Sequence, residues 1–265
     1  MPTRLVHLVA DALDPPALAR FWAAALGWEV VDENEHESNV APAGYHYPDA
    51  GAVLLCFVPV PEPKTGKNRV HLDLATGSAV HQAAEVERLL ALGAVHTDIG
   101  QKGVPWVVLA DPEGNEFCVL DPRPKYRDTG PVAAIVLDCP DPIAATKFWR
   151  TATGWVPARP DEDYASLRAP AGVGPFLELL PSDDVKTVKD RIHIDVAPHR
   201  GEDHAAAVRE LLAAGAVPID IGQGGVGWTV LAGPEGNEFC VLSPRLPGPG
   251  QRSRAAAQAA SRSAR

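Results

Sequence analysis

The feature that most constrains this chain is an internal repeat, because its two halves carry the same motifs in the same order. Segment 14–28 recurs at 141–155, segment 69–73 at 191–195, and segment 93–123 at 215–245. The tryptophans pair in the same way: Trp22 with Trp149, Trp28 with Trp155, and Trp106 with Trp228. Self-similarity over this length predicts two copies of one structural unit. A unit of roughly 120 residues can bury a core of its own.

The boundaries of the copies follow from composition. The first copy spans 1–123 and the second 131–245, and the segment between them, 124–130, contains proline, glycine and charged residues that disfavour a strand or helix. We therefore expect 124–130 to be a linker. The final segment, 246–265, is rich in Arg, Ser, Ala and Gln and has no apolar periodicity, which predicts a disordered tail.

Each copy is predicted to contain two βαβββ units. In the first unit, segment 5–9 is strand-like, Asp14 is placed to cap a helix, and Gly27 to end it. The second unit begins with a strand at 70–74 and continues with a helix capped by Ser78. Strands are then expected near 94–98, 104–109 and 116–120. The alternation of helices with groups of strands predicts an α+β fold.

Three motifs carry a family resemblance: a Phe-Trp pair in the first helix, a Leu-Gly-Trp at its exit, and the turn Asp-Pro-Glu-Gly-Asn at 111–115. In this order they resemble the vicinal-oxygen-chelate superfamily, which includes glyoxalase I, bleomycin-resistance proteins and extradiol dioxygenases, and most of all its tandem glyoxalase-like domain proteins. The resemblance covers 3–123 and 130–245. It implies that the two βαβββ units of each domain form a curved mixed sheet around a ligand-binding cleft.

The resemblance also implies a divalent metal held by side chains of the first, fifth and last strands. The matching positions are His7, His71 and Cys118 in the first copy and Ala134, His193 and Cys240 in the second. Both copies thus have cysteine where superfamily members have glutamate, and the second copy lacks one ligand. A tetrahedral two-histidine, one-cysteine site for zinc, or a site for Fe, Ni or Mn, is expected in the first copy only. Glu116 shares a strand face with Cys118 and is an alternative oxygen ligand.

Metal-free chemistry is a second interpretation of the same positions. His71 with Asp73 or Glu116 could act as a general base, and His193 with Asp195 or Glu238 repeats the arrangement. A third interpretation makes the two histidines hydrogen-bonded core residues and the cysteines small core residues. Because both copies keep His and Cys but only one keeps the third metal position, this third interpretation is favoured over a metal.

Three further residues are candidates for ligand binding. Glu178 lies in the apolar strand 176–180, at the position of Cys56 in the first copy, so it must be paired, hydrated or functional if it is buried. A position at a strand edge facing solvent is favoured over a functional role. Trp106 and Trp228 lie on strands expected to border the clefts, where they could stack on a planar ligand or serve as packing.

Composition excludes several functions. The net charge of −10 disfavours binding to nucleic acids or anionic membranes, and no apolar run is long enough to span a bilayer. Because no secretion signal is evident, we expect four reduced cysteines and a cytoplasmic protein. The sequence favours a monomer or homodimer that binds a small molecule without turnover, as sequestering or resistance proteins do. The alternative is a metal-dependent lyase, isomerase or dioxygenase acting on a small oxygenated substrate.

Overall fold

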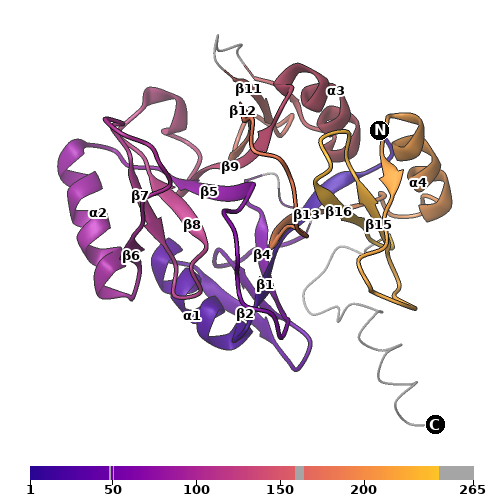
Figure 1. Ribbon diagram of the computed structural model, residues 1–265. Helices are drawn as coiled ribbons and strands as arrows, with labels where there is room; N and C mark the ends of the chain where they lie inside the picture. The colour runs from indigo at the N-terminus through magenta and orange to yellow at the C-terminus, as the bar shows by residue number, and fades with distance from the viewer. Residues whose placement is uncertain (48, 50, 159–163, 245–265) are drawn as a thin grey trace.

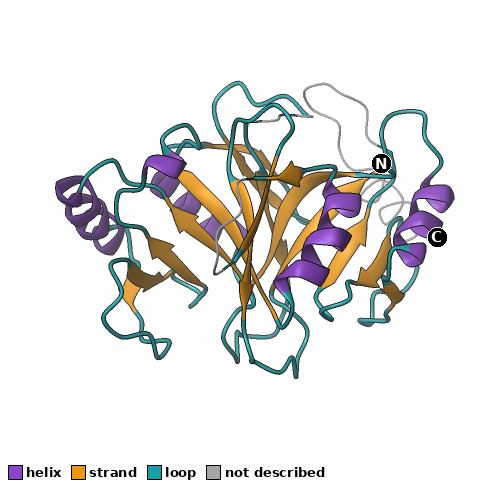
Figure 2. Ribbon diagram, turned by 90° about the horizontal axis from the view of Figure 1, so that it is seen from above, coloured by secondary structure: helices purple, strands orange, loops and turns teal. Residues whose placement is uncertain are grey.

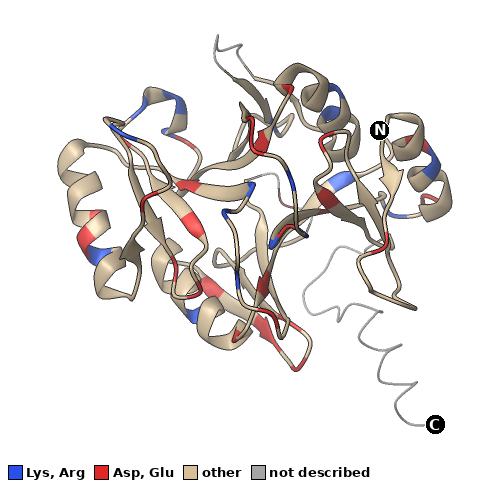
Figure 3. Cartoon of the chain, in the orientation of Figure 1, with Lys and Arg blue, Asp and Glu red and all other residues tan. Residues whose placement is uncertain are grey.

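The computed structural model describes residues 1–47, 49, 51–158 and 164–244. The predicted disordered tail, 246–265, lies outside these residues. Among the helices described, none combines the length and the apolar character that crossing a lipid bilayer requires. Figure 3 shows that acidic residues are spread over both halves and occur within strands as well as in loops.

The helices begin and end where local sequence chemistry predicts. Helix α1 (Pro15–Leu26) is capped by Asp14, whose side chain accepts a hydrogen bond from the Ala17 N–H, and it ends at Gly27 in the left-handed conformation, with φ of 64°. Its counterpart α3 (Pro142–Thr153) has the same kinds of cap. Ser78 caps α2 (Ala79–Ala91), and α4 (His204–Ala213) is equivalent to it.

The described residues contain sixteen strands in addition to these helices. Those of the first half are β1 (Arg4–Ala12), β2 (Glu29–Glu33), β3 (Ser38–Ala41), β4 (Leu54–Pro59), β5 (Val70–Leu74), β6 (Val95–His96), β7 (Val107–Ala110) and β8 (Glu116–Val119). Those of the second half are β9 (Val132–Cys139), β10 (Val156–Pro157), β11 (Ala165–Arg168), β12 (Phe176–Pro181), β13 (Ile192–Ala197), β14 (Val217–Pro218), β15 (Thr229–Ala232) and β16 (Glu238–Val241). Each half therefore contains two βαβββ units, which confirms the predicted α+β fold.

The strands form two eight-stranded mixed sheets, each joining one unit from each half (Figure 1). Sheet A has the order β14-β15-β16-β13-β1-β4-β3-β2, and sheet B has the order β10-β11-β12-β9-β5-β8-β7-β6. The joints are the antiparallel pairs of β1 with β13 and of β5 with β9. The units that share a sheet thus come from different halves, whereas the sequence analysis placed both units of one copy in the same sheet.

The helices pack on one face of the sheets, and within each half an aromatic helix joins one sheet to the other. Phe21 and Trp22 of α1, which belongs to sheet A, contact Phe117 of sheet B, with centroids of Trp22 and Phe117 5.1 Å apart. Phe148 and Trp149 of α3 contact Phe239 in the same way. Figure 2 shows the strands in the middle of the molecule, with helices around them. We call the opposite, helix-free face of each sheet its inner face.

Candidate functional sites on the inner faces

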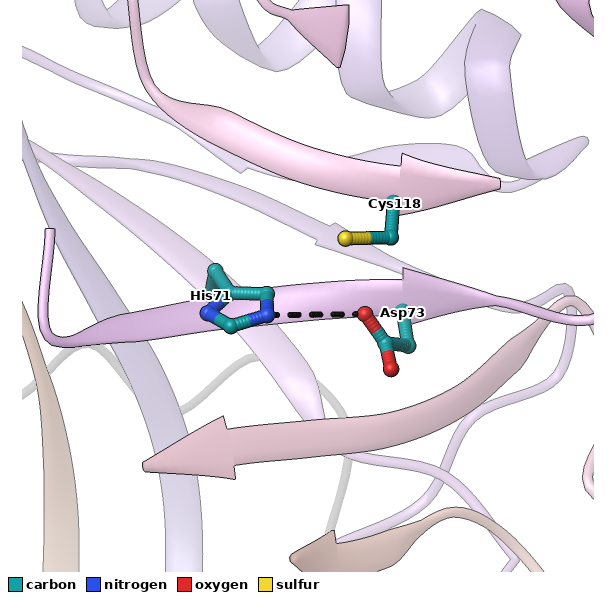
Figure 4. A group of neighbouring side chains, drawn as sticks. All are labelled: His71, Asp73 and Cys118. Atoms are coloured by element: carbon teal, nitrogen blue, oxygen red, sulfur yellow. Dashed lines mark ion pairs between the residues drawn. The ribbon is translucent and has the colours of Figure 1, made fainter. Parts of the chain in front are cut away.

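The inner face of sheet B carries a compact polar cluster of His71, Asp73 and Cys118. His71 and Asp73 alternate with buried apolar residues on β5, and Cys118 of β8 lies opposite Asp73 in the strand register. The His71 Nε2 lies 3.5 Å from Asp73 Oδ1 (Figure 4), and one ligand atom from each residue lies within 4.8 Å of the other two. Strand alternation and register therefore bring together the two sequence candidates His71 and Cys118.

The inner face of sheet A repeats this cluster with His193, Asp195 and Cys240. The His193 Nε2 is 3.4 Å from Asp195 Oδ1 and 3.6 Å from the Cys240 Sγ. His7 of β1 adds a fourth member, because its Nδ1 lies 3.7 Å from the second oxygen of Asp195. All four side chains are buried, with exposed fractions of 4–7%.

This geometry corrects the predicted grouping of His7 with His71 and Cys118. The antiparallel pairing of β1 with β13 sets His7 opposite Asp195 in sheet A, whereas His71 and Cys118 lie in sheet B. In sheet B the position of His7 is taken by Ala134, which lies opposite Asp73. Because each sheet combines one unit from each half, the cluster in sheet A has four polar side chains and the cluster in sheet B has three.

Electrostatics fix the charge states of both clusters. Burial raises the pKa of Asp195, but hydrogen bonds and charge from His193 and His7 lower it by more, so this carboxylate is ionised. Burial lowers the pKa of His71, and Asp73 raises it by more, so its net pKa lies above the ordinary value. For Cys118 and Cys240, burial and the adjacent aspartate raise the thiol pKa well above its usual range. In sheet A the cluster thus combines an anionic carboxylate, Asp195, with a neutral thiol, Cys240.

The two glutamates proposed as general bases, Glu116 and Glu238, are already held by lysines. Glu116 accepts hydrogen bonds from Lys64 Nζ at 2.7 Å and from the Asn68 N–H at 3.2 Å. Glu238 accepts the equivalent bonds from Lys186 and the Asp190 N–H, at 2.7 and 3.1 Å. These contacts anchor the loops that lead into β5 and β13. Because lysine and backbone donors already occupy these carboxylate oxygens, the geometry suits a structural role better than the predicted catalytic one.

Glu178 is buried on the inner face of sheet B, with an exposed fraction of 3%, and does not face solvent at a strand edge. It accepts a hydrogen bond from the Tyr126 hydroxyl at 3.0 Å and pairs with Lys125 Nζ at 2.7 Å. Both partners belong to the segment predicted as a linker, where the short helix η1 (Pro124–Tyr126) forms. Sequence analysis missed Lys125 and Tyr126, because prolines in that segment indicate only that regular structure ends.

Comparison with known proteins places this architecture in a family. The sequence model of the glyoxalase-like domain matches residues 7–120 and again residues 134–242. The chain belongs to the glyoxalase-like domain family. This glyoxalase-like protein is similar in fold to glyoxalase I from Zea mays, with 17% identity, coverage of 91% of this chain and 92% of that one, and a TM-score of 0.64.

A second similar structure is the putative dioxygenase from Bacillus subtilis subsp. subtilis str. 168. It has 14% identity and a TM-score of 0.59, and the match covers 92% of the glyoxalase-like chain and 86% of the other. At these identities the likeness shows a shared fold. No curated protein matches the glyoxalase-like chain in sequence.

Members of the superfamily typically hold a divalent metal, and the donor atoms of both clusters fit one. Asp73 Oδ1 and Asp195 Oδ1 are buried and lie 3.5 and 3.4 Å from the Nε2 atoms of His71 and His193. Each faces an imidazole nitrogen and lies near a thiol, so nitrogen, oxygen and sulfur donors meet within 4.8 Å of one another.

Trp106 and Trp228 lie at the rims of the two inner faces. Their indole N–H groups donate to Gln101 and Gln223, at 2.8 and 3.0 Å. Each ring is half-buried and packs against the apolar cluster around the cysteine of its own sheet. Stacking of a planar ligand on these rings stays a prediction, which their half-exposed position supports.

Proposed function

We propose that this protein binds a small molecule on the inner face of sheet A, where His193, Asp195 and Cys240 hold a divalent metal ion. The observation that carries the proposal is the meeting of one ligand atom each from His193, Asp195 and Cys240 within 4.8 Å of one another at a buried position. A buried carboxylate oxygen carries a desolvation penalty, which the contact of Asp195 Oδ1 with His193 Nε2, at 3.4 Å, offsets only in part. A cation between this oxygen, His193 and Cys240 would remove that penalty.

The donor set indicates which metals fit. Imidazole nitrogen and thiolate sulfur favour zinc and similar soft cations over magnesium or calcium. The Cys240 thiol must lose its proton to become a ligand, so metal affinity is expected to rise with pH. When bound, such a metal would polarise an oxygen atom of the ligand or of a water molecule.

Residues of the chain itself supply the remaining functions of the site. His7 contacts the second oxygen of Asp195 and so fixes the orientation of this carboxylate. Trp228 offers a half-buried aromatic surface at the rim of the same face. Sheet B suits a metal less well, because Ala134 replaces the histidine and Lys125 already provides a cation beside Glu178.

We further propose binding without turnover. The neutral thiols of Cys118 and Cys240 are poor nucleophiles, since the thiolate is the reactive form. Glu116 and Glu238, the expected general bases, are engaged by lysines. Ligand binding that quenches tryptophan fluorescence and leaves the compound unchanged would support sequestration.

One observation favours an enzyme of the superfamily as the second candidate. Asp195 lies between His7 and His193, so a proton could be held at either imidazole and delivered to a substrate. Consumption of a small oxygenated compound, abolished by His193→Ala, would select this candidate over sequestration.

Metal content tests the central proposal. Purified protein is dialysed, titrated with zinc, and measured by elemental analysis and calorimetry. We expect one tightly bound equivalent per chain, lost in His193→Ala and Cys240→Ser and retained in the matched control Cys118→Ser. The proposal fails if the wild-type protein takes up no divalent metal, or if Cys118→Ser abolishes uptake while Cys240→Ser does not.

A further inference from the structure

Sheet B holds a lysine ammonium group in a setting normally found around a bound cation. Lys125 Nζ pairs with Glu178 at 2.7 Å and donates a hydrogen bond to the Tyr164 hydroxyl at 2.8 Å. It also lies 4.5 Å from the ring centroid of Tyr164, 4.8 Å from that of Phe176 and 5.5 Å from that of Tyr126. All three distances are within the range of cation–π attraction, about 6 Å.

Most of the groups that surround this ammonium belong to sheet B, whereas the ammonium itself and Tyr126 belong to the connecting segment. Phe176 and Glu178 lie on β12, where pairing with β11 and β9 fixes them, and Tyr164 directly precedes β11. Lys125 lies in η1, between the two halves. Sheet B therefore supplies the carboxylate and the Phe176 ring of the site, and the connecting segment supplies the ammonium group that occupies it.

Charge and access both point to an exchangeable cation. Glu178 has an exposed fraction of only 3%. A carboxylate so deeply buried strongly destabilises the fold unless a cation lies beside it. The Lys125 side chain keeps an exposed fraction of 27%, so it lies between the buried Glu178 and solvent. Burial raises the pKa of Glu178 and Lys125 lowers it, which agrees with this dependence.

The pairing of a buried carboxylate with an ammonium group occurs in sheet B and not at the equivalent position of sheet A. Glu178 lies opposite Val136 of β9, and the equivalent residue in sheet A is Cys56, opposite Val9 of β1. A thiol at that position supplies no negative counter-charge for an ammonium group. The cation preference of sheet B is thus separate from the metal cluster proposed in sheet A.

We propose that the inner face of sheet B is a binding site for the ammonium group of a small aliphatic amine, and that Lys125 is its tethered occupant. A group tethered by a short segment competes with an effective concentration in the millimolar range or above. A free amine therefore binds weakly to the wild-type chain, and removal of the lysine side chain exposes the site. The charge of Glu178 and the rings of Phe176 and Tyr164 supply recognition.

The test uses n-propylammonium chloride as the probe and Lys125→Ala as the exposed site, with ionic strength held constant by sodium chloride. We expect Lys125→Ala to melt at a lower temperature than wild type, and the probe to restore much of the loss. Its affinity for Lys125→Ala should be at least about tenfold higher than for wild type. Lys102→Ala, which removes an exposed lysine, is the matched control and should respond as wild type does.

The double variant Lys125→Ala/Glu178→Gln separates specific binding from a general salt effect. It should show no stabilisation by the probe, because the counter-charge is gone. Equal stabilisation of the single and double variants overturns the proposal, as does a folded Lys125→Ala that ignores the probe. If Lys125→Ala folds only when the amine is present, the proposal is supported. If it stays unfolded with the amine while the double variant folds, the proposal fails.

Discussion

The aspartates of the two clusters offer a matched pair of substitutions. Asp195 is contacted by two buried histidines, His7 and His193, at 3.7 and 3.4 Å. Asp73 is contacted by one, His71, at 3.5 Å, because Ala134 occupies the position of the second. Replacing each aspartate by asparagine removes the charge while nearly preserving the shape.

The difference between the two variants follows from the number of contacts. A hydrogen bond to a charged group contributes about 1.5–3 kcal/mol, and the lower value suits distances as long as these. We therefore expect Asp73→Asn to lower the free energy of unfolding by about 1.5 kcal/mol and Asp195→Asn by about 3 kcal/mol. In a protein of this size the difference corresponds to about 3–6 °C in melting temperature.

Thermal and chemical unfolding in the presence of a chelator measures the intrinsic effect without metal. In a His7→Ala background, sheet A has the same residue as sheet B at this position, so Asp195→Asn should then cost about 1.5 kcal/mol, as Asp73→Asn does. Equal losses for Asp73→Asn and Asp195→Asn in the wild-type background would refute the reasoning, as would an unchanged loss after His7→Ala.

The stability contributions of the two clusters should depend on pH in opposite directions. The pKa of Asp195 is lowered on folding, so its contribution is complete above the ordinary value of 3.8 and is lost as pH falls toward the lowered pKa. The pKa of His71 is raised on folding, so its contribution is complete below 6.5 and is lost as pH rises through the raised pKa. The loss in Asp73→Asn should therefore be larger at pH 6 than at pH 9.

Three further expectations follow from the fold. A chain cut within the linker 124–130 should still elute as one species in size-exclusion chromatography, because β1 pairs with β13 and β5 with β9 across the halves; separate halves would contradict the topology. Trp22→Phe should destabilise the protein by about 1–2 kcal/mol more than Trp149→Phe in denaturant titrations. The reason is that the Trp22 indole donates to Asp111, whereas the Trp149 indole has no partner in the described part of the chain, and equal losses would contradict this account. The four buried cysteines should react slowly with a thiol reagent in the folded state and all at once after unfolding, and fast labelling of the native protein would show that they are accessible.

Local features of the fold were predictable, because local chemistry determines them. Asp14 and Ser78 accept hydrogen bonds from the first turns of their helices, and Gly27 supplies the left-handed residue that ends α1. The partner of β1 was not predictable in the same way. β5 and β13 are repeats of each other, so the side-chain pattern of β1 fits either strand equally well.

The same limit applied to the sites. His71, Asp73 and Cys118 could be grouped from sequence, since strand alternation and one parallel strand pair bring them together. The location of His7 depended on the unpredicted pairing of β1 with β13. Lys125 could not be identified from the sequence, because its partner Glu178 is distant in the chain and no local pattern indicates such a contact.

The crossing of the halves has a consequence for how the two faces can diverge. When two identical chains build a pair of twofold-related sites, any substitution alters both sites together. Here β1 contributes to sheet A alone and β9 to sheet B alone, so each face changes independently. His7 and Ala134, like Cys56 and Glu178, are equivalent positions that now differ. Covalent fusion thus lets a single polypeptide hold two specialised sites on one symmetric frame.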